Sequence, residues 1–307
     1  MNDGGQDSRH AEIAIPAVAL AVLAWGLGPL MVRGMGVSGY TVALYRMWLG
    51  APAMYLASRW WGQALTWKTL KVCVVPGIFF GASMVMGFIA VRTTSIANAT
   101  LIGALTPALI LLGLNRLVGE RSDWRKIPFA IVAFSGLALV ILSGGNTDGA
   151  SLKGDLWAAI NVLSFTVYFM ILKRHRNDGL DGWSFLAGVF IVGGLLITPV
   201  CLLMADDTWQ VAGWDWVLLI AMVVGPGWVG HGLISWASRH LPVTITSLLT
   251  LGSPVVSCLG GWLVYEQHLG WTQLLGALLV LAGLAGSVWD RSSRGSVEIE
   301  PVLEPLS

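Results

Sequence analysis

The sequence SIANATLIGALTPALILLGLNRLVGE at residues 95–120 returns in altered form at residues 242–266 as PVTITSLLTLGSPVVSCLGGWLVYE. Pro107 lies in the first copy and Pro254 in the second, so the copies are 147 residues apart. One residue is missing before the second glutamate, where the spacing falls to 146. Because this period is close to half the chain length, it predicts two copies of one structural unit rather than a solenoid.

The composition predicts that both copies lie in a membrane. Of the 307 residues, 55% are hydrophobic and only 11% are charged, and the mean hydropathy is +0.73. Apolar runs recur that approach the ~20 residues a helix needs to cross a hydrocarbon core of ~30 Å. The net charge of +1 does not indicate nucleic-acid binding, since no basic stripe carries interleaved aromatic residues.

The three cysteines do not form a recognisable site. Cys73, Cys201 and Cys258 each lie inside an apolar run. Their spacing fits neither a disulfide framework nor a zinc site, so we interpret them as small buried hydrophobic residues. We therefore expect no metal and no cofactor.

Ten apolar segments are predicted to cross the bilayer. Each must be helical, because hydrocarbon offers an unpaired backbone no hydrogen-bond partner. They run over residues 13–33, 40–58, 70–90, 97–118, 127–144, 154–173, 184–204, 214–236, 244–264 and 271–289. The expected fold class is an all-α polytopic membrane protein.

The lysines and arginines predict the orientation. With the N-terminus inside, fourteen of the eighteen basic residues fall on the inner side. Arg33, Arg92 and Lys153 fall outside, and Arg46 lies within a span. Both termini are therefore predicted to be cytoplasmic, in a multi-pass protein of the cell membrane.

Five spans per half is an odd number, so the two copies are predicted to insert in opposite directions. Arg92 then faces out, and its counterpart Arg239 faces in. Such inverted repeats give many carriers two exchangeable states around one central site. The predicted organisation is a cytoplasmic tail at 1–12, a first repeat at 13–144, a linker at 145–153, a second repeat at 154–290 and a disordered cytoplasmic tail at 291–307.

Short motifs inside this frame resemble a known family. They are Ala24-Trp25-Gly26, Leu44-Tyr45-Arg46 and the two proline-to-glutamate stretches that end in LVGE and LVYE. With ten spans in two inverted halves, the chain from about 13 to 290 resembles the EamA-type transporters of the drug/metabolite transporter superfamily. The second copy departs from the family pattern at Tyr265, where glycine is usual.

The resemblance implies a basket of ten helices around a central cavity. In relatives the first four helices of each half line this cavity, while the fifth and tenth lie outside, where a homodimer contact is available. Known members move amino acids, other metabolites, nucleotide sugars or drugs, mostly outward in bacteria.

Arg46, beside Tyr45 near the start of the second span, is the first candidate for binding cargo. An ionisable residue within a span is costly and calls for a functional hypothesis. Its guanidinium can pair with a carboxylate through two parallel hydrogen bonds. The alternative is an interfacial arginine that reaches back to the headgroups.

His231, in the eighth span, is the second candidate. It follows Pro226 and Trp228 in a glycine-rich stretch, where a proline can open the helix backbone and free carbonyl groups. Its imidazole can hydrogen-bond cargo or take up a proton. The alternative is a histidine satisfied by a neighbouring helix.

Other polar and aromatic residues within spans are weaker candidates for the cavity lining. They are Trp25, Tyr45, Asn98, Asn161, Tyr168 and Trp228. Asn161 and Tyr168 belong to a stripe along the sixth span that should face the interior. Asn98 has an alternative role, because a single asparagine often only links helices.

Pro107 and Pro254 occupy matching places, so they are candidate hinges, as is Pro226. Each is equally consistent with a passive packing kink. Gly77 and Gly81 form a small-residue motif that favours close helix packing.

The predicted function is export of a small organic metabolite through the bilayer by alternating access. An amino acid or related carboxylate is favoured by Arg46, by His231 and by the lack of an acid at the centre of any span. The alternative cargo is a neutral metabolite or an amphipathic drug. An intramembrane transferase is disfavoured, since no convergent nucleophile or metal cluster is apparent, and we expect no enzyme activity.

Overall fold

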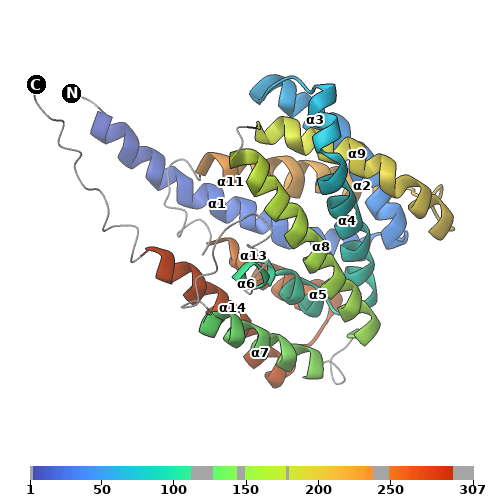
Figure 1. Ribbon diagram of the computed structural model, residues 1–307. Coiled ribbons are helices and arrows are strands. Elements are labelled where there is room, and N and C mark those ends of the chain that lie inside the picture. The colour runs from blue at the N-terminus through green and yellow to red at the C-terminus, as the bar shows by residue number, and fades with distance from the viewer. Residues whose placement is uncertain (1–2, 112–126, 144–148, 178–179, 238–248, 293–307) are drawn as a thin grey trace, which may run out of the picture.

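The computed structural model describes residues 3–111, 127–143, 149–177, 180–237 and 249–292. Within these ranges the regular structure is helical and no strand occurs. The helices are α1 (Asp3–Gly34), α2 (Gly39–Trp61), α3 (Trp67–Val72), α4 (Val74–Thr93), α5 (Ile96–Gly103), α6 (Thr106–Leu111), α7 (Ile127–Ser143), α8 (Leu152–Asn177), α9 (Gly182–Met204), α10 (Trp214–Met222), the π-helix η4 (Val223–Gly230), α11 (His231–Ala237), α13 (Gly252–Tyr265) and α14 (Trp271–Ser292). Figure 1 shows them as one bundle, with the N-terminal part of α1 projecting from it.

The described helices include five that are long and apolar enough to cross a membrane. They lie at Ile13–Gly34, Val74–Thr93, Leu152–Leu172, Gly182–Met204 and Trp214–Ile234. Two shorter apolar helices lie at Ile127–Leu142 and Trp271–Gly286. The all-helical membrane architecture is thereby confirmed, whereas the count of ten spans stays a prediction.

Two equivalent interruptions mark the fourth and ninth predicted spans. Between α5 and α6 the helix opens at Ala104 and Leu105, and before α13 it opens at Leu251. Ala104 precedes Pro107 by three residues, as Leu251 precedes Pro254. A proline lacks an N–H and clashes with the carbonyl four residues earlier, which explains a break at this distance. The repeated sequence therefore produces a repeated backbone feature.

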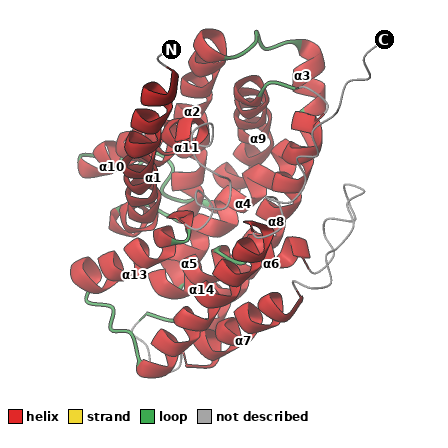
Figure 2. Ribbon diagram, turned by 90° about the vertical axis from the view of Figure 1, so that its left-hand side faces the viewer, coloured by secondary structure: helices red, strands yellow, loops and turns green. Residues whose placement is uncertain are grey.

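Glycines bring two pairs of helices into backbone contact. A Cβ added at Gly81 would lie 2.7 Å from Ile197 and 3.1 Å from the carbonyl oxygen of Gly193, so the Gly77–Gly81 motif on α4 packs against α9. On α7, a Cβ at Gly136 would lie 2.6 Å from the carbonyl oxygen of Gly276 on α14. Helices α7 and α14 lie side by side in both ribbon views (Figures 1 and 2). The small-residue motif thus marks close packing, as expected.

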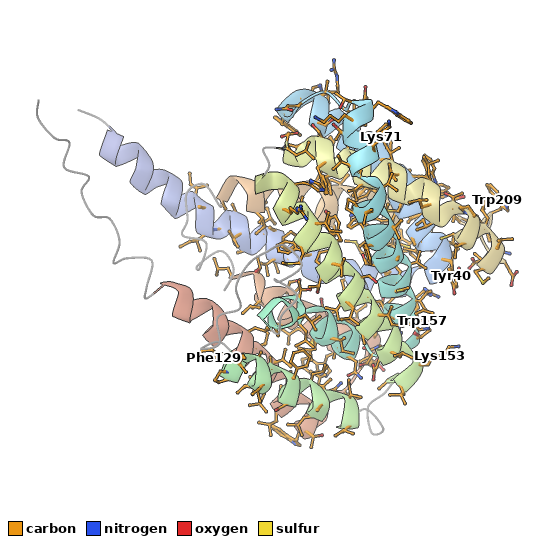
Figure 3. The ribbon with its side chains drawn as sticks, in the orientation of Figure 1. Tyr40, Lys71, Phe129, Lys153, Trp157 and Trp209 are labelled. Carbon is orange, nitrogen blue, oxygen red and sulfur yellow. The ribbon has the colours of Figure 1, made fainter. Side chains whose placement is uncertain are left out.

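The described loops separate into two groups at opposite ends of the bundle. The Arg33 end comprises residues 34–38, 94–95, 149–151, 205–213 and 266–270, which are joined by hydrogen bonds. The Asp181 end comprises residues 62–66 and 181, where Asp181 accepts from the backbone N–H of Gln63. Figure 3 shows Lys71 near the Asp181 end and Lys153 near the Arg33 end. Residues 62–66 and 181 therefore each lie at the opposite end from the described loops that come before and after them.

Two arginines at the Arg33 end cap each other's helices. Arg33, at the end of α1, donates to the carbonyl oxygens of Val91 and Thr94 at 2.8 and 3.0 Å. Arg92, at the end of α4, donates in return to Val32 and Met35 at 3.2 and 2.6 Å. The last carbonyl groups of a helix lack partners and attract cations. This exchange satisfies both helix ends and holds α1 against α4.

Further hydrogen bonds at the Arg33 end join the two halves of the chain. Tyr265 donates to the carbonyl oxygen of Leu30 at 2.8 Å, and the side chain of Gln267 accepts from the N–H of Ile96 at 2.9 Å. Asp207 accepts from Ser38 and from Thr41, at the start of α2. These bonds close the Arg33 end of the bundle, where α1, α4 and α13 have their C-terminal ends.

A buried polar network lies just beneath this end. Asp155 on α8 is 4% exposed; it accepts from the Thr94 hydroxyl at 2.6 Å, and the side-chain Nδ2 of Asn98 donates to both of its carboxylate oxygens at 3.1 Å. Gln273 on α14 donates to the Asn98 oxygen at 2.7 Å. Because buried polar groups stabilise a fold only when they are paired, this network links α5, α8 and α14 specifically.

We expect Gly136→Ala to destabilise the contact between α7 and α14. The new methyl group would collide with the backbone of Gly276, and such overpacking costs ~1–3 kcal/mol. Thermal unfolding in detergent checks this, with Gly232→Ala on α11 as the control, because a Cβ there meets nothing within 4 Å. Equal unfolding temperatures for the two variants would contradict the close packing.

Asp207 should make stability depend on pH. Partial burial pushes the pKa of its carboxyl upward, but hydrogen bonds from Thr41 and Ser38 outweigh this and hold the pKa below its ordinary value. A lowered folded-state pKa stabilises the protein above the unfolded pKa of ~3.9, and this contribution disappears as the pH falls through the folded pKa.

Thermal unfolding of wild type and Asp207→Asn should therefore differ at pH 6 and converge in more acidic buffer. The exposed neighbour Asp206 provides the control, since Asp206→Asn should match wild type throughout. A constant gap between wild type and Asp207→Asn down to pH 3 would refute this role.

Candidate functional site

Arg46 lies inside the bundle, and no carboxylate among the described residues is paired with its charge. The side chain points from α2 toward α9 and η4 and is only 7% exposed. In the part of the chain that the structure describes, Nη1 is buried and has no hydrogen-bond acceptor. A buried donor without a partner costs ~1–3 kcal/mol, and a charged one costs more. The guanidinium therefore lies among the helices of the protein, and the choice between a cargo-binding and an interfacial arginine stays a prediction.

An aromatic ring and a glycine lie beside the guanidinium of Arg46. Its Cζ atom lies 5.8 Å from the centre of the Phe190 ring on α9, within range of a cation–π interaction. On η4, a Cβ at Gly227 would lie 3.2 and 3.3 Å from the two terminal nitrogens of Arg46. A glycine at position 227 therefore leaves room for the guanidinium beside the π-helix.

Trp228 supplies a second buried donor next to Gly227. No described residue accepts a hydrogen bond from its Nε1, which is also buried. Its ring lies 6.1 Å from that of Trp61, at the C-terminal end of α2. Arg46 and Trp61 are fifteen residues apart on this helix, or ~22 Å along its axis. The N–H donors of Arg46 and Trp228 thus lie between the middle of α2 and the Asp181 end.

Aromatic rings extend from Arg46 to Tyr168. Phe190 contacts Phe80 with ring centres 5.2 Å apart, and Phe80 contacts Tyr168 at 4.8 Å. Tyr168 is 4% exposed, so it belongs to the packing behind the site. Neither Phe190 nor Phe80 was singled out from the sequence, because one phenylalanine in an apolar span carries no local signal.

Trp25 is engaged with the opened helix of the eighth span. Its Nε1 donates to the carbonyl oxygen of Pro226 at 3.0 Å. A Cβ at Gly230 would lie 2.4 Å from the same nitrogen, so the indole fits only beside a glycine. Pro226 lies in the π-helix η4 and its carbonyl oxygen accepts this bond from α1, whereas its role as a hinge stays a prediction.

The structure places other predicted site residues away from Arg46. Tyr45 donates to the carbonyl oxygen of Thr208 at 3.2 Å and packs edge-on against Trp216. Asn98 lies in the network of Asp155, and Asn161 packs against Gly87 on α4. Their roles in cargo binding stay predictions.

The side chains of two further candidates lie outside the described residues. His231 begins α11, immediately after the π-helix, and Pro107 lies in the first turn of α6. Only their backbone positions can be stated. Among the predicted residues, Trp25 and Pro226 are joined by a hydrogen bond, and Arg46 lies beside Gly227, the neighbour of Trp228 in the chain.

The site has the chemistry of an anion receptor. It presents one fixed positive charge and a neutral N–H donor, both shielded from water. No described aspartate or glutamate pairs with Arg46, since Asp155, Asp207 and Asp215 bond at the Arg33 end and Asp181 at the other. A carboxylate satisfies a guanidinium through charge-assisted hydrogen bonds.

Comparisons with known proteins agree with a carrier. A model of the EamA-like transporter family matches residues 12–142 and 152–289. An uncharacterized transporter from Archaeoglobus fulgidus is 24% identical over 270 residues, covering 87% of this chain and 93% of the relative. The pseudopaline exporter CntI from Pseudomonas aeruginosa is 22% identical over 245 residues, covering 79% of this chain and 81% of the exporter.

A solved crystal structure shares the fold, with a TM-score of 0.62 at 22% identity, over 92% of this chain and 99% of the other. The matched relatives are transporters rather than enzymes, so the transferase alternative is not carried further. The two matched segments span both repeats predicted from the sequence. The chain belongs to the EamA-like transporter family.

Proposed function

We propose that this protein exports a small organic carboxylate, such as an amino acid or related metabolite, across the cytoplasmic membrane. The observation that carries the proposal is the buried guanidinium of Arg46, whose Nη1 lacks an acceptor among the described residues. Cargo that supplies the missing acceptor gains affinity there, because it removes an existing cost. Export by the pseudopaline exporter CntI supports the direction by analogy.

Transport is proposed to proceed by alternating access. The hydrogen bonds of Arg33, Tyr265 and Gln267 hold the Arg33 end closed, so cargo would reach Arg46 from the Asp181 end. The basic residues Arg59, Lys68 and Lys71 adjoin the Asp181 end, which favours a cytoplasmic location for it. Both termini would then be cytoplasmic as well.

The helix breaks before Pro107 and Pro254 are proposed as hinges for the change of state. Each removes helical hydrogen bonds at the same place in its repeat, and hinges commonly lie at such element ends. Helix α13 also carries Tyr265, which bonds to α1 at the Arg33 end. Bending at Leu251 would therefore separate this contact. The predicted homodimer remains a proposal without a described contact.

A neutral or amphipathic cargo is the second candidate. It is favoured by the ring of Phe190 beside Arg46 and by the paired rings of Trp61 and Trp228 toward the Asp181 end, which offer aromatic surface. The two candidates differ in their need for the positive charge, so substitution of Arg46 distinguishes them.

We expect Arg46→Ala to weaken binding of a transported carboxylate by ~10- to 100-fold, because a charged hydrogen bond contributes ~1.5–3 kcal/mol. Arg46→Lys should retain part of the affinity through its charge. Uptake into inside-out vesicles measures the loss. The control is Arg59→Ala, which removes an exposed arginine from the same helix. Unchanged transport by Arg46→Ala would favour the neutral cargo.

Locking the Arg33 end should stop turnover. The backbone N–H of Gly36 donates to Asp215 at 2.9 Å, so cysteines in place of these residues can be joined by a short thiol cross-linker. In a background without Cys73, Cys201 and Cys258, we expect a cleavable cross-linker to abolish transport and a reductant to restore it. Full activity of the cross-linked protein would contradict alternating access at this end.

A further inference from the structure

Two buried donors without an acceptor face the region between α2 and η4. They are Nη1 of Arg46 and Nε1 of Trp228, which lack hydrogen-bond partners among the described residues. A Cβ at Gly227, adjacent to Trp228, would lie 3.2 and 3.3 Å from the terminal nitrogens of Arg46, so the Arg46 guanidinium lies beside the segment of η4 that carries Trp228. A ligand with two acceptor atoms and one negative charge matches this pair, as a carboxylate does.

No aspartate or glutamate that the structure describes is bonded to Arg46 or Trp228, where it could serve as the counter-ion of a positive group of the ligand. The acids that the structure describes near the loops are bonded there, Asp155 to Asn98 and Asp181 to Ser184. The opened backbone of η4 does not replace them at Pro226, because Trp25 occupies that carbonyl oxygen. An ammonium group brought into this region would be buried without a counter-ion, which is costly.

Aromatic rings form the remaining surface close to the two donors. Phe190 lies against the guanidinium of Arg46, and Trp61 lies against Trp228. A ligand held by its carboxylate would therefore place its remaining atoms beside apolar ring surfaces. Such surfaces favour a flat or branched apolar group over a polar one.

We infer that the site selects apolar monocarboxylates that lack an ammonium group, and disfavours zwitterionic amino acids of the same shape. The inference rests on the proposed carboxylate function and narrows it. It assigns charge recognition to Arg46, the second hydrogen bond to Trp228 and the apolar contact to the rings of Phe190 and Trp61. The site would thereby distinguish cargo by whether the α-carbon carries an ammonium group, and not by the size of the cargo.

Three probes that share the same phenyl ring and the same chain length separate the effect of the carboxylate from that of the ammonium group. They are 3-phenylpropanoate, L-phenylalanine and 2-phenylethylamine, of which the first has only the carboxylate and the last only the ammonium. Binding to the purified full chain in lipid nanodiscs is measured by calorimetry. We expect 3-phenylpropanoate to bind at least about tenfold more tightly than L-phenylalanine, a difference of ~1.4 kcal/mol, and 2-phenylethylamine not to bind.

Two variants locate the site within the same experiment. Arg46→Gln should abolish binding of 3-phenylpropanoate, and Trp228→Phe should weaken it about fivefold, because it keeps a ring but removes one neutral hydrogen bond. Arg59→Gln serves as the control for loss of a positive charge from α2. The Trp228→Phe variant keeps the test valid if Arg46→Gln does not fold.

The outcomes distinguish failure of the proposed carboxylate function from failure of the proposed selectivity against an ammonium group. If L-phenylalanine binds as tightly as 3-phenylpropanoate and both depend on Arg46, the selectivity is wrong while the carboxylate function stands. If 2-phenylethylamine binds as well as 3-phenylpropanoate, or neither carboxylate binds, the carboxylate function fails and the selectivity fails with it. Unchanged binding by Trp228→Phe would overturn the assigned second hydrogen bond.

Discussion

The backbone of a membrane-spanning chain has to pair its own polar groups, because hydrocarbon contains no water to do so. This protein meets the constraint even where its helices are broken. At the break before Pro107, the N–H of Leu105 donates to Ile102 at 3.1 Å. In the π-helix, Trp25 takes the carbonyl oxygen of Pro226, and at the ends of α1 and α4 the arginines Arg33 and Arg92 take the last carbonyl groups. The irregular parts of the fold are therefore held by specific side chains.

Against this background the unpaired donors of Arg46 and Trp228 are informative. Asp155, Asn98 and Gln273 show that the fold pairs buried polar side chains where their role is structural. Arg46 lies equally deep and is left with an open position at Nη1. No described residue accepts a hydrogen bond from Arg46 Nη1 or Trp228 Nε1, and the proposed binding of a ligand would account for both donors.

The sequence predicted the features that depend on short-range pattern. Apolar runs gave the helical class, the repeated prolines gave the paired breaks, and the isolated charge of Arg46 identified the donor that the structure leaves unpaired. Contacts between distant segments were not predictable. Asp155 lies at the start of a predicted span, but the sequence carries no signal of its burial against Thr94 and Asn98, which lie 61 and 57 residues away. Phe190 reaches Arg46 only because α2 and α9 pack together.

The two repeats contribute different residues to the site, which is apparent only from the structure. Arg46 comes from the first half, whereas Phe190, Gly227 and Trp228 come from the second, so movement between the halves would alter the site itself.

The most direct measurement is a structure of the protein in lipid nanodiscs with bound 3-phenylpropanoate. The carboxylate should lie within hydrogen-bond distance of Arg46 Nη1 and Trp228 Nε1. A carboxylate bound elsewhere, with Arg46 paired to a group of the protein, would contradict the assignment of this residue as the cargo anchor.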